Sequence, residues 1–188
     1  MYIKLNVSMI IILISLLVSL CIPEISYYLI MSLFYCPKLL EIDNPLGFII
    51  PYLFIPSFFN FIVSMYIFYY NSLKVELYFG SKKYIFIFLL SCILTSLISF
   101  CIGLFFKEFF NYLVFWESLW YGITPITLCL RTFYFYKIDM NFLIFGNEIN
   151  SKNMIWIELL ILTLGDSLER FGILLAGVIT GNILYYFF

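Results

Sequence analysis

Residues 84–106 contain no charged side chain, and this uninterrupted apolar run restricts the possible fold more than any other feature. A helix that spans a membrane needs about 20 predominantly apolar residues. The whole chain has the same character, because 64% of its 188 residues are hydrophobic and 11% are charged. A soluble domain is about 45–50% apolar and about 25% charged. The sequence therefore predicts an all-α integral membrane protein, and its net charge of −1 does not favour nucleic-acid binding.

Six apolar segments follow one another, separated by polar or turn-forming residues. We expect the first to be retained, because Pro23 and Glu24 after it form a poor signal-peptide cleavage site. Together the segments predict one domain over residues 1–188, a bundle of six membrane-spanning helices. The predicted spans are about 5–22, 48–72, 84–106, 113–134, 154–166 and 168–187.

Basic residues predict the orientation of these spans. With a cytosolic N-terminus, seven lysines and arginines lie on the cytosolic side and three on the far side, as the positive-inside rule requires. Both termini are then cytosolic. The cytosolic set is Lys4, Lys74, Lys82, Lys83, Arg131, Lys137 and Lys152, and the other set is Lys38, Lys107 and Arg170.

Asn60 and Ser64 stand four residues apart in the second predicted span, so they share one helix face. An unpaired amide in hydrocarbon is costly, and we expect both side chains to face other helices. They either form a structural hydrogen bond between helices or line a polar path for another chain.

Glu158 is an acid inside the short fifth span, and such an acid is by default a functional hypothesis. Counted from the expected helix start at residue 154, it lies about 6–8 Å along the helix axis. It pairs with Arg131 near the end of the fourth span, lines a groove, or reaches to the membrane interface. The sequence leaves these alternatives open.

Gly177 and Gly181 are four residues apart in the sixth predicted span. Small residues at this spacing let another helix approach closely, because no side chain holds the two backbones apart. We therefore expect the sixth helix to pack centrally in the bundle.

Catalysis and metal binding have little support in the sequence. The chain contains no histidine, and none of its five cysteines belongs to a C-x-x-C pair, so a Cys/His zinc site is not expected. Rhomboid proteases use a Gly-x-Ser-Gly serine with a histidine, whereas Ser167 is followed by Leu168. Because the usual general base is missing, we expect no enzymatic activity, no metal and no cofactor.

Several stretches in collinear order, from about residue 7 to residue 187, resemble the Derlins, proteolytically inactive members of the rhomboid superfamily. One is Ile50-Pro51-Tyr52-Leu53-Phe54, and another is Leu164-Gly165-Asp166-Ser167. The last runs from Gly177 to Phe187. The single positions that match family motifs include Phe59, Asn60, Phe61, Met65, Glu76, Met140, Asn141, Phe142 and Gly165.

The chain also departs from the family pattern. The family's Trp-Arg pair in the first luminal loop is absent near Leu46-Gly47, and Asn182 stands in place of a histidine. Only Phe188 follows the last predicted span, so no cytosolic tail is present in this sequence and we expect the hexameric unfolding ATPase to be engaged only indirectly. The resemblance indicates a divergent, minimal member.

The resemblance implies a six-helix rhomboid-like fold in the endoplasmic reticulum membrane. It implies a non-enzymatic role in moving misfolded proteins back to the cytosol for degradation. The implied partners are a membrane ubiquitin ligase complex, misfolded client proteins and membrane lipid. In this interpretation Asn60, Ser64 and Glu158 line a substrate groove, beside a short fifth helix that thins the bilayer.

Two alternatives remain open. Residues 125–131, Pro-Ile-Thr-Leu-Cys-Leu-Arg, resemble a run in the proton-channel subunit of rotary ATP synthases, whose arginine faces the proton-carrying ring. A structural membrane subunit of a large complex is the other alternative.

Overall fold

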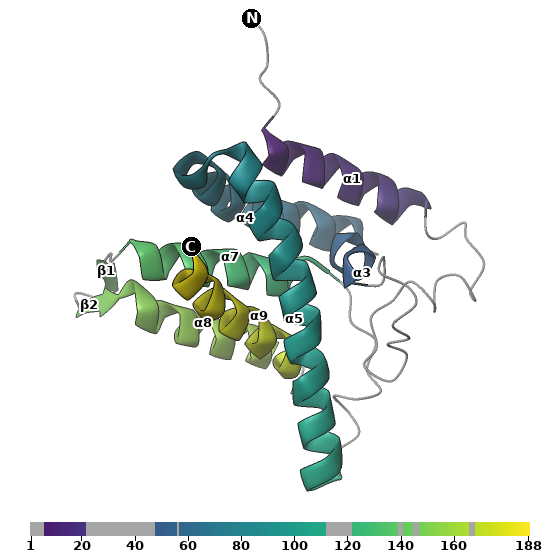
Figure 1. The fold of residues 1–188 in the computed structure, drawn as a ribbon, viewed down its shortest axis with the longest axis vertical. Helices are drawn as coiled ribbons and strands as arrows, with labels where there is room; N and C mark the ends of the chain where they lie inside the picture. The colour runs from purple at the N-terminus through teal and green to yellow at the C-terminus, as the bar shows by residue number, and fades with distance from the viewer. Residues whose placement is uncertain are drawn as a thin grey trace, which may run out of the picture.

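The computed structural model describes residues 6–21, 48–55, 57–111, 122–138, 141–144, 147–165 and 168–188, and the structural statements below concern these residues. This part of the chain is mainly α-helical (Figure 1). The helices are α1 (Val7–Cys21), α3 (Ile50–Leu53), α4 (Phe58–Phe79), α5 (Ser81–Phe110), α7 (Thr124–Lys137), α8 (Ser151–Gly165) and α9 (Leu168–Phe187).

Two of the described helices are long and apolar enough to cross a membrane, by length and composition alone. They are α5 and the part of α9 from Arg170 to Phe187. Helices α7 and α8 have 14 and 15 residues, so they measure only about 21–22 Å. A span of the usual thickness needs about 17–25 residues. Six membrane crossings therefore remain a proposal.

Helix bounds agree with the predicted segments at both ends of the chain but not in the middle. Helix α9 has the bounds of the sixth segment, and α1 lies within the first. The second predicted segment, 48–72, is wrong as a single helix, since the backbone is extended at Phe54, after α3. Helix α4 then runs on to Phe79.

The loop expected after residue 72 is therefore helical except at Gly80. Gly80 has φ +81°, a conformation that residues with a Cβ rarely adopt, and it alone separates α4 from α5. Its N–H donates to the carbonyl oxygen of Glu76 at 2.8 Å, which closes the last turn of α4. As a consequence, Lys74 and Glu76 lie on a helix face rather than in a loop.

The all-α prediction also missed a small β-hairpin in the polar connection after α7. Strands β1 (Asn141–Ile144) and β2 (Asn147–Asn150) pair antiparallel, with Asn141 opposite Asn150. Asn141 and Phe142, two of the family-motif matches, lie on β1, whereas Met140 lies outside the described residues.

Helix α9 packs mainly against α7 and α5, as Figure 1 shows. A Cβ added to Gly177 would overlap the carbonyl oxygen of Pro125, and one added to Gly181 would lie 2.6 Å from Thr132 Cβ. Both glycines thus lie where the backbones of α9 and α7 approach each other closely. On the α5 side, the hydroxyl of Thr95 donates to that of Thr180 at 3.2 Å. Hydroxyl bonds between helices are typical of membrane bundles.

Candidate functional site

A cavity of about 390 Å³ lies between α4, α7 and α8, and it brings together charged side chains from distant parts of the sequence. Lys74 comes from α4, Arg131 from α7 and Glu158 from α8. Its remaining lining side chains are Tyr66, Ile67, Tyr70, Asn71 and Phe135. We call this cavity, defined by these eight residues, the interhelix pocket.

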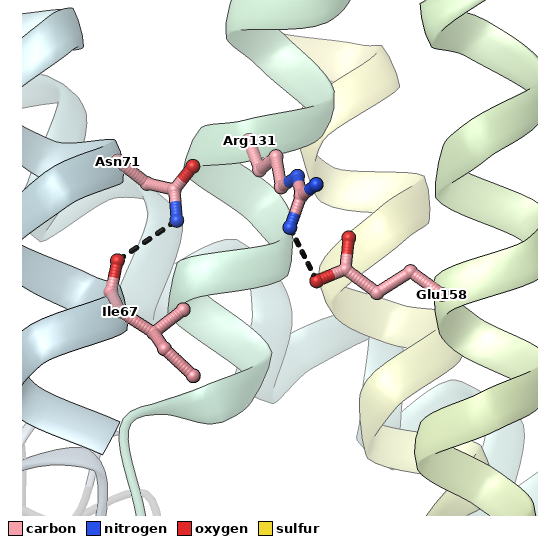
Figure 2. Close-up of polar contacts among 4 residues, drawn as sticks. All are labelled: Ile67, Asn71, Arg131 and Glu158. Atoms are coloured by element: carbon pink, nitrogen blue, oxygen red, sulfur yellow. Dashed lines mark hydrogen bonds and ion pairs between the residues drawn. The ribbon is translucent and has the colours of Figure 1, made fainter. Parts of the chain in front are cut away.

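The centre of the pocket is an ion pair between α7 and α8. Arg131 Nη1 donates to Glu158 Oε1 at 2.6 Å, and Figure 2 shows the two side chains pointing toward each other. Their side chains are 24% and 23% exposed. Glu158 lies seven residues after Ser151, where α8 begins. It is therefore about 10 Å along the helix, deeper than the 6–8 Å expected from a start at residue 154.

The pair is made through a single contact, which leaves hydrogen-bonding capacity unused. Arg131 Nε and Glu158 Oε2 are buried and have no hydrogen-bond partner among the described residues. The Arg131 guanidinium also lies 5.1 Å from the centre of the Phe135 ring, one turn further along α7. Buried polar atoms without partners are rare, and at the edge of a cavity they indicate a place where a ligand can hydrogen-bond.

Packing of α8 explains why Glu158 is held at the pocket. Ile155 and Leu159 are buried four residues apart, in a cluster with Leu128 of α7 and Leu174 of α9. They fix the rotation of α8 about its own axis. Glu158, next to Leu159, is thereby directed along the side of α7 that carries Arg131.

The α4 wall of the pocket contributes an amide and a cation that sequence reasoning missed. Asn71 is 6% exposed, and its Nδ2 donates to the carbonyl oxygen of Ile67 at 2.8 Å (Figure 2). Lys74 Nζ lies 4.0 Å from the centre of the Tyr70 ring and 5.7 Å from that of Tyr134. Residues 67, 70, 71 and 74 share one helix face. This face could not be recognised from the sequence, because Lys74 was expected in a loop.

The predicted polar strip at Asn60 and Ser64 is not part of the interhelix pocket. Asn60 is exposed in the first turn of α4, so the prediction that it faces other helices is wrong within this chain. Its backbone N–H donates to the hydroxyl of Ser57 at 3.5 Å. Ser64 is half-buried and does not line the pocket. Of the three predicted groove residues, Glu158 alone lies there.

The physical reason is the rotation of α4. Phe61, Met65 and Phe68 are buried in the main core cluster, at helical spacing. Asn60 lies beside that buried face rather than on it. Phe59, another family-motif match, is 74% exposed, whereas the matches Phe61 and Met65 are core residues.

Glu76, the next match, forms a second polar cluster near Gly80, outside the predicted spans. Its Oε1 accepts from Val7 N (2.9 Å) and Ser81 Oγ (2.8 Å), and its Oε2 accepts from Ser8 N (3.0 Å) and Ser8 Oγ (2.6 Å). The carboxylate thus caps the N-terminus of α1, where free N–H groups and the helix dipole favour an anion. Burial raises the pKa of Glu76, but its hydrogen bonds to Ser8, Ser81 and Val7 together lower the pKa by more. The net pKa therefore lies below its ordinary value.

The other predicted positions that the structure describes do not line the interhelix pocket. Gly165 ends α8, and Ser167, the serine considered for catalysis, lies outside the described residues. Within the described ranges, no three His, Cys, Asp or Glu side chains gather closely enough to hold a metal ion.

Comparisons with known proteins leave the family open. No protein-family model matches the chain, and no curated protein matches it.

Proposed function

We propose that the chain is a divergent Derlin-like protein of the endoplasmic reticulum membrane, which helps misfolded proteins return to the cytosol for degradation. The single observation that supports this best is the interhelix pocket, a cavity between apolar helices that contains a half-buried ion pair. The sequence resemblance supplies the family. The six-span arrangement, with both termini cytosolic, is part of the same proposal.

The surroundings of the pocket fit a groove in a membrane. Large apolar side chains on α4 and α8 are exposed, among them Phe58, Phe59, Ile62, Trp156, Leu160, Ile161 and Leu164. In water such surfaces are costly, whereas lipid covers them at no cost. Helix α8 measures about 22 Å, against about 30 Å of hydrocarbon, and a short helix thins the bilayer around it.

The groove would act by offering hydrogen bonds to an unfolded chain. Peptide groups that enter hydrocarbon without partners cost several kcal/mol each. Arg131 Nε, a donor, and Glu158 Oε2, an acceptor, are buried without partners in the described chain, so a passing peptide group would bond to them once the two side chains turn toward the pocket. The protein therefore lowers the barrier to passage without cutting a bond, and a membrane ubiquitin ligase complex receives the client. The unfolding ATPase would act through that complex.

Localisation and client turnover test the proposal together. A tagged copy should localise to the endoplasmic reticulum and copurify with a membrane ubiquitin ligase in mild detergent. Arg131→Leu combined with Glu158→Leu removes the polar groups while avoiding a lone buried charge, and it should lengthen client half-life. Glu108→Gln, at an exposed acid paired with Lys107 on α5, is the control. Copurification with a rotary ring, or unchanged client half-life in the double variant, would overturn the proposal.

A further inference from the structure

The interhelix pocket has an uneven charge balance. It contains two cations, Lys74 and Arg131, and one carboxylate, Glu158, which is bonded to Arg131. No carboxylate in the described part of the chain forms an ion pair with Lys74, whose ammonium group lies over the Tyr70 ring instead. The pocket is therefore complementary to a group with negative charge.

The walls of the pocket are amphipathic in a way that limits what this group can belong to. Tyr66 and Tyr70 on α4 are 73% and 57% exposed, and they line the pocket beside the cations. On α8, Glu158 is the residue that lines the pocket, and Ile161, one turn further on the same side of the helix, is 61% exposed. A ligand that fits has one anionic end for the cations and long apolar parts for these two helix faces.

We propose that the pocket binds the headgroup of an anionic phospholipid. Its phosphate lies against Lys74 and Arg131, and its acyl chains run over the exposed faces of α4 and α8. Basic pockets between membrane helices on the cytoplasmic side bind anionic headgroups in this way. The inference rests on the membrane location in the proposed function, and it adds a ligand that regulates the same groove.

Binding would act on the ion pair. A phosphate at Arg131 would lie beside the Glu158 carboxylate, which has the same sign of charge and already accepts a hydrogen bond from Arg131 Nη1. A lipid would thus occupy the groove in the resting protein, and a client chain would have to displace it. Removal of the neighbouring carboxylate should therefore tighten lipid binding.

Lipid selectivity of the purified full chain tests this inference. In detergent, dioctanoyl phosphatidylserine and dioctanoyl phosphatidylcholine are titrated and the bound lipid is counted by native mass spectrometry. We expect the anionic lipid to bind more tightly, and Lys74→Gln to weaken it roughly fivefold, from the usual energy of one basic residue at an anionic surface. Lys74→Arg should keep the selectivity, and Glu158→Gln should increase it.

Lys82→Gln is the matched control, because Lys82 is an exposed cation at the start of α5 and does not line the pocket. It should leave selectivity unchanged. Equal binding of the two lipids would overturn the lipid as occupant. So would an equal loss of lipid binding in Lys74→Gln and Lys82→Gln, or binding of inorganic phosphate as tight as that of the anionic lipid. Client half-life is a separate readout. If the wild-type chain binds the anionic lipid selectively and client turnover is normal in the Arg131–Glu158 double variant, the lipid site is supported and the proposed function is overturned.

Discussion

At the scale of single residues, the Arg131–Glu158 pair decides how the pocket behaves. The sequence left Glu158 either paired, facing a groove or reaching to the interface. The structure has it paired at 2.6 Å and lining a cavity at the same time. These two roles are compatible because the pair uses one contact, and the buried Nε and Oε2 atoms remain without partners in the described chain.

Glu158→Leu should destabilise the protein by roughly 1–3 kcal/mol, because it leaves a half-buried guanidinium unpaired. Adding Arg131→Leu should recover most of this loss, since coupled neighbours are not additive. Unfolding in detergent, followed for the two single variants and the double variant, measures the coupling. Simple addition of the two single losses would mean that the pair does not contribute to folding.

Glu76 is a second decisive residue, and its effect depends on pH. Its folded pKa is lowered, so the stability it contributes is present above its ordinary pKa of 4.5 and is lost as pH falls through the lower folded value. Glu76→Gln should cost about 0.5–2 kcal/mol at neutral pH, the usual range for loss of a helix cap. The free energy of unfolding should also fall less steeply below pH 4.5 in this variant than in wild type. An unchanged acid slope would contradict the capping role, and Glu108→Gln serves as the exposed control.

At the scale of elements, the contact between α7 and α9 depends on two missing side chains. Helix α9 carries Gly177 and Gly181 against the backbone of Pro125 and Cys129. A backbone atom cannot move aside as a flexible side chain does, so the space is determined by the helix–helix distance.

Gly177→Ala and Gly181→Ala should each lower stability by roughly 1–3 kcal/mol, and the leucine variants should lower the folded yield further. Tyr186→Leu, at a position of α9 that is 83% exposed, should change little. Thermal unfolding of the purified variants in detergent makes the comparison. Alanine variants as stable as wild type would show that the two helices can separate at little cost.

At the scale of the whole molecule, the proposed orientation places the pocket in the cytosolic half of the membrane. Lys74, Arg131 and Glu158 were each expected toward that side by the positive-inside count or by their place in a span, and the pocket joins them. An anionic cytosolic leaflet would then lie next to the two cations.

Protease protection in sealed microsomes tests this orientation. Epitope tags at the N-terminus and at the C-terminus should both be digested without permeabilisation, because an even number of spans puts them on the same side. A tag that is digested only after detergent is added would contradict either the number of spans or their direction.

Local sequence determined where helices form, because an apolar run long enough to be helical is visible without any knowledge of its neighbours. Residues 168–187 and the stretch within 5–22 are examples. The same local reasoning placed the bounds of the second segment, 48–72, wrongly. The break after α3 and the continuation of α4 to Phe79 depend on packing.

Only the tertiary structure decided which side chains meet. In a chain this apolar, lipid-facing and protein-facing sides have similar composition, so hydropathy identifies a helix without identifying its packed face. For this reason the sequence placed Asn60 inward, although the structure exposes it, and overlooked Asn71 and Lys74. Glu158 could be named from its chemistry alone, since a carboxylate in an apolar run is costly wherever the helix is turned. Its partner and its pocket follow from the rotation of α8 on α7, which long-range packing sets.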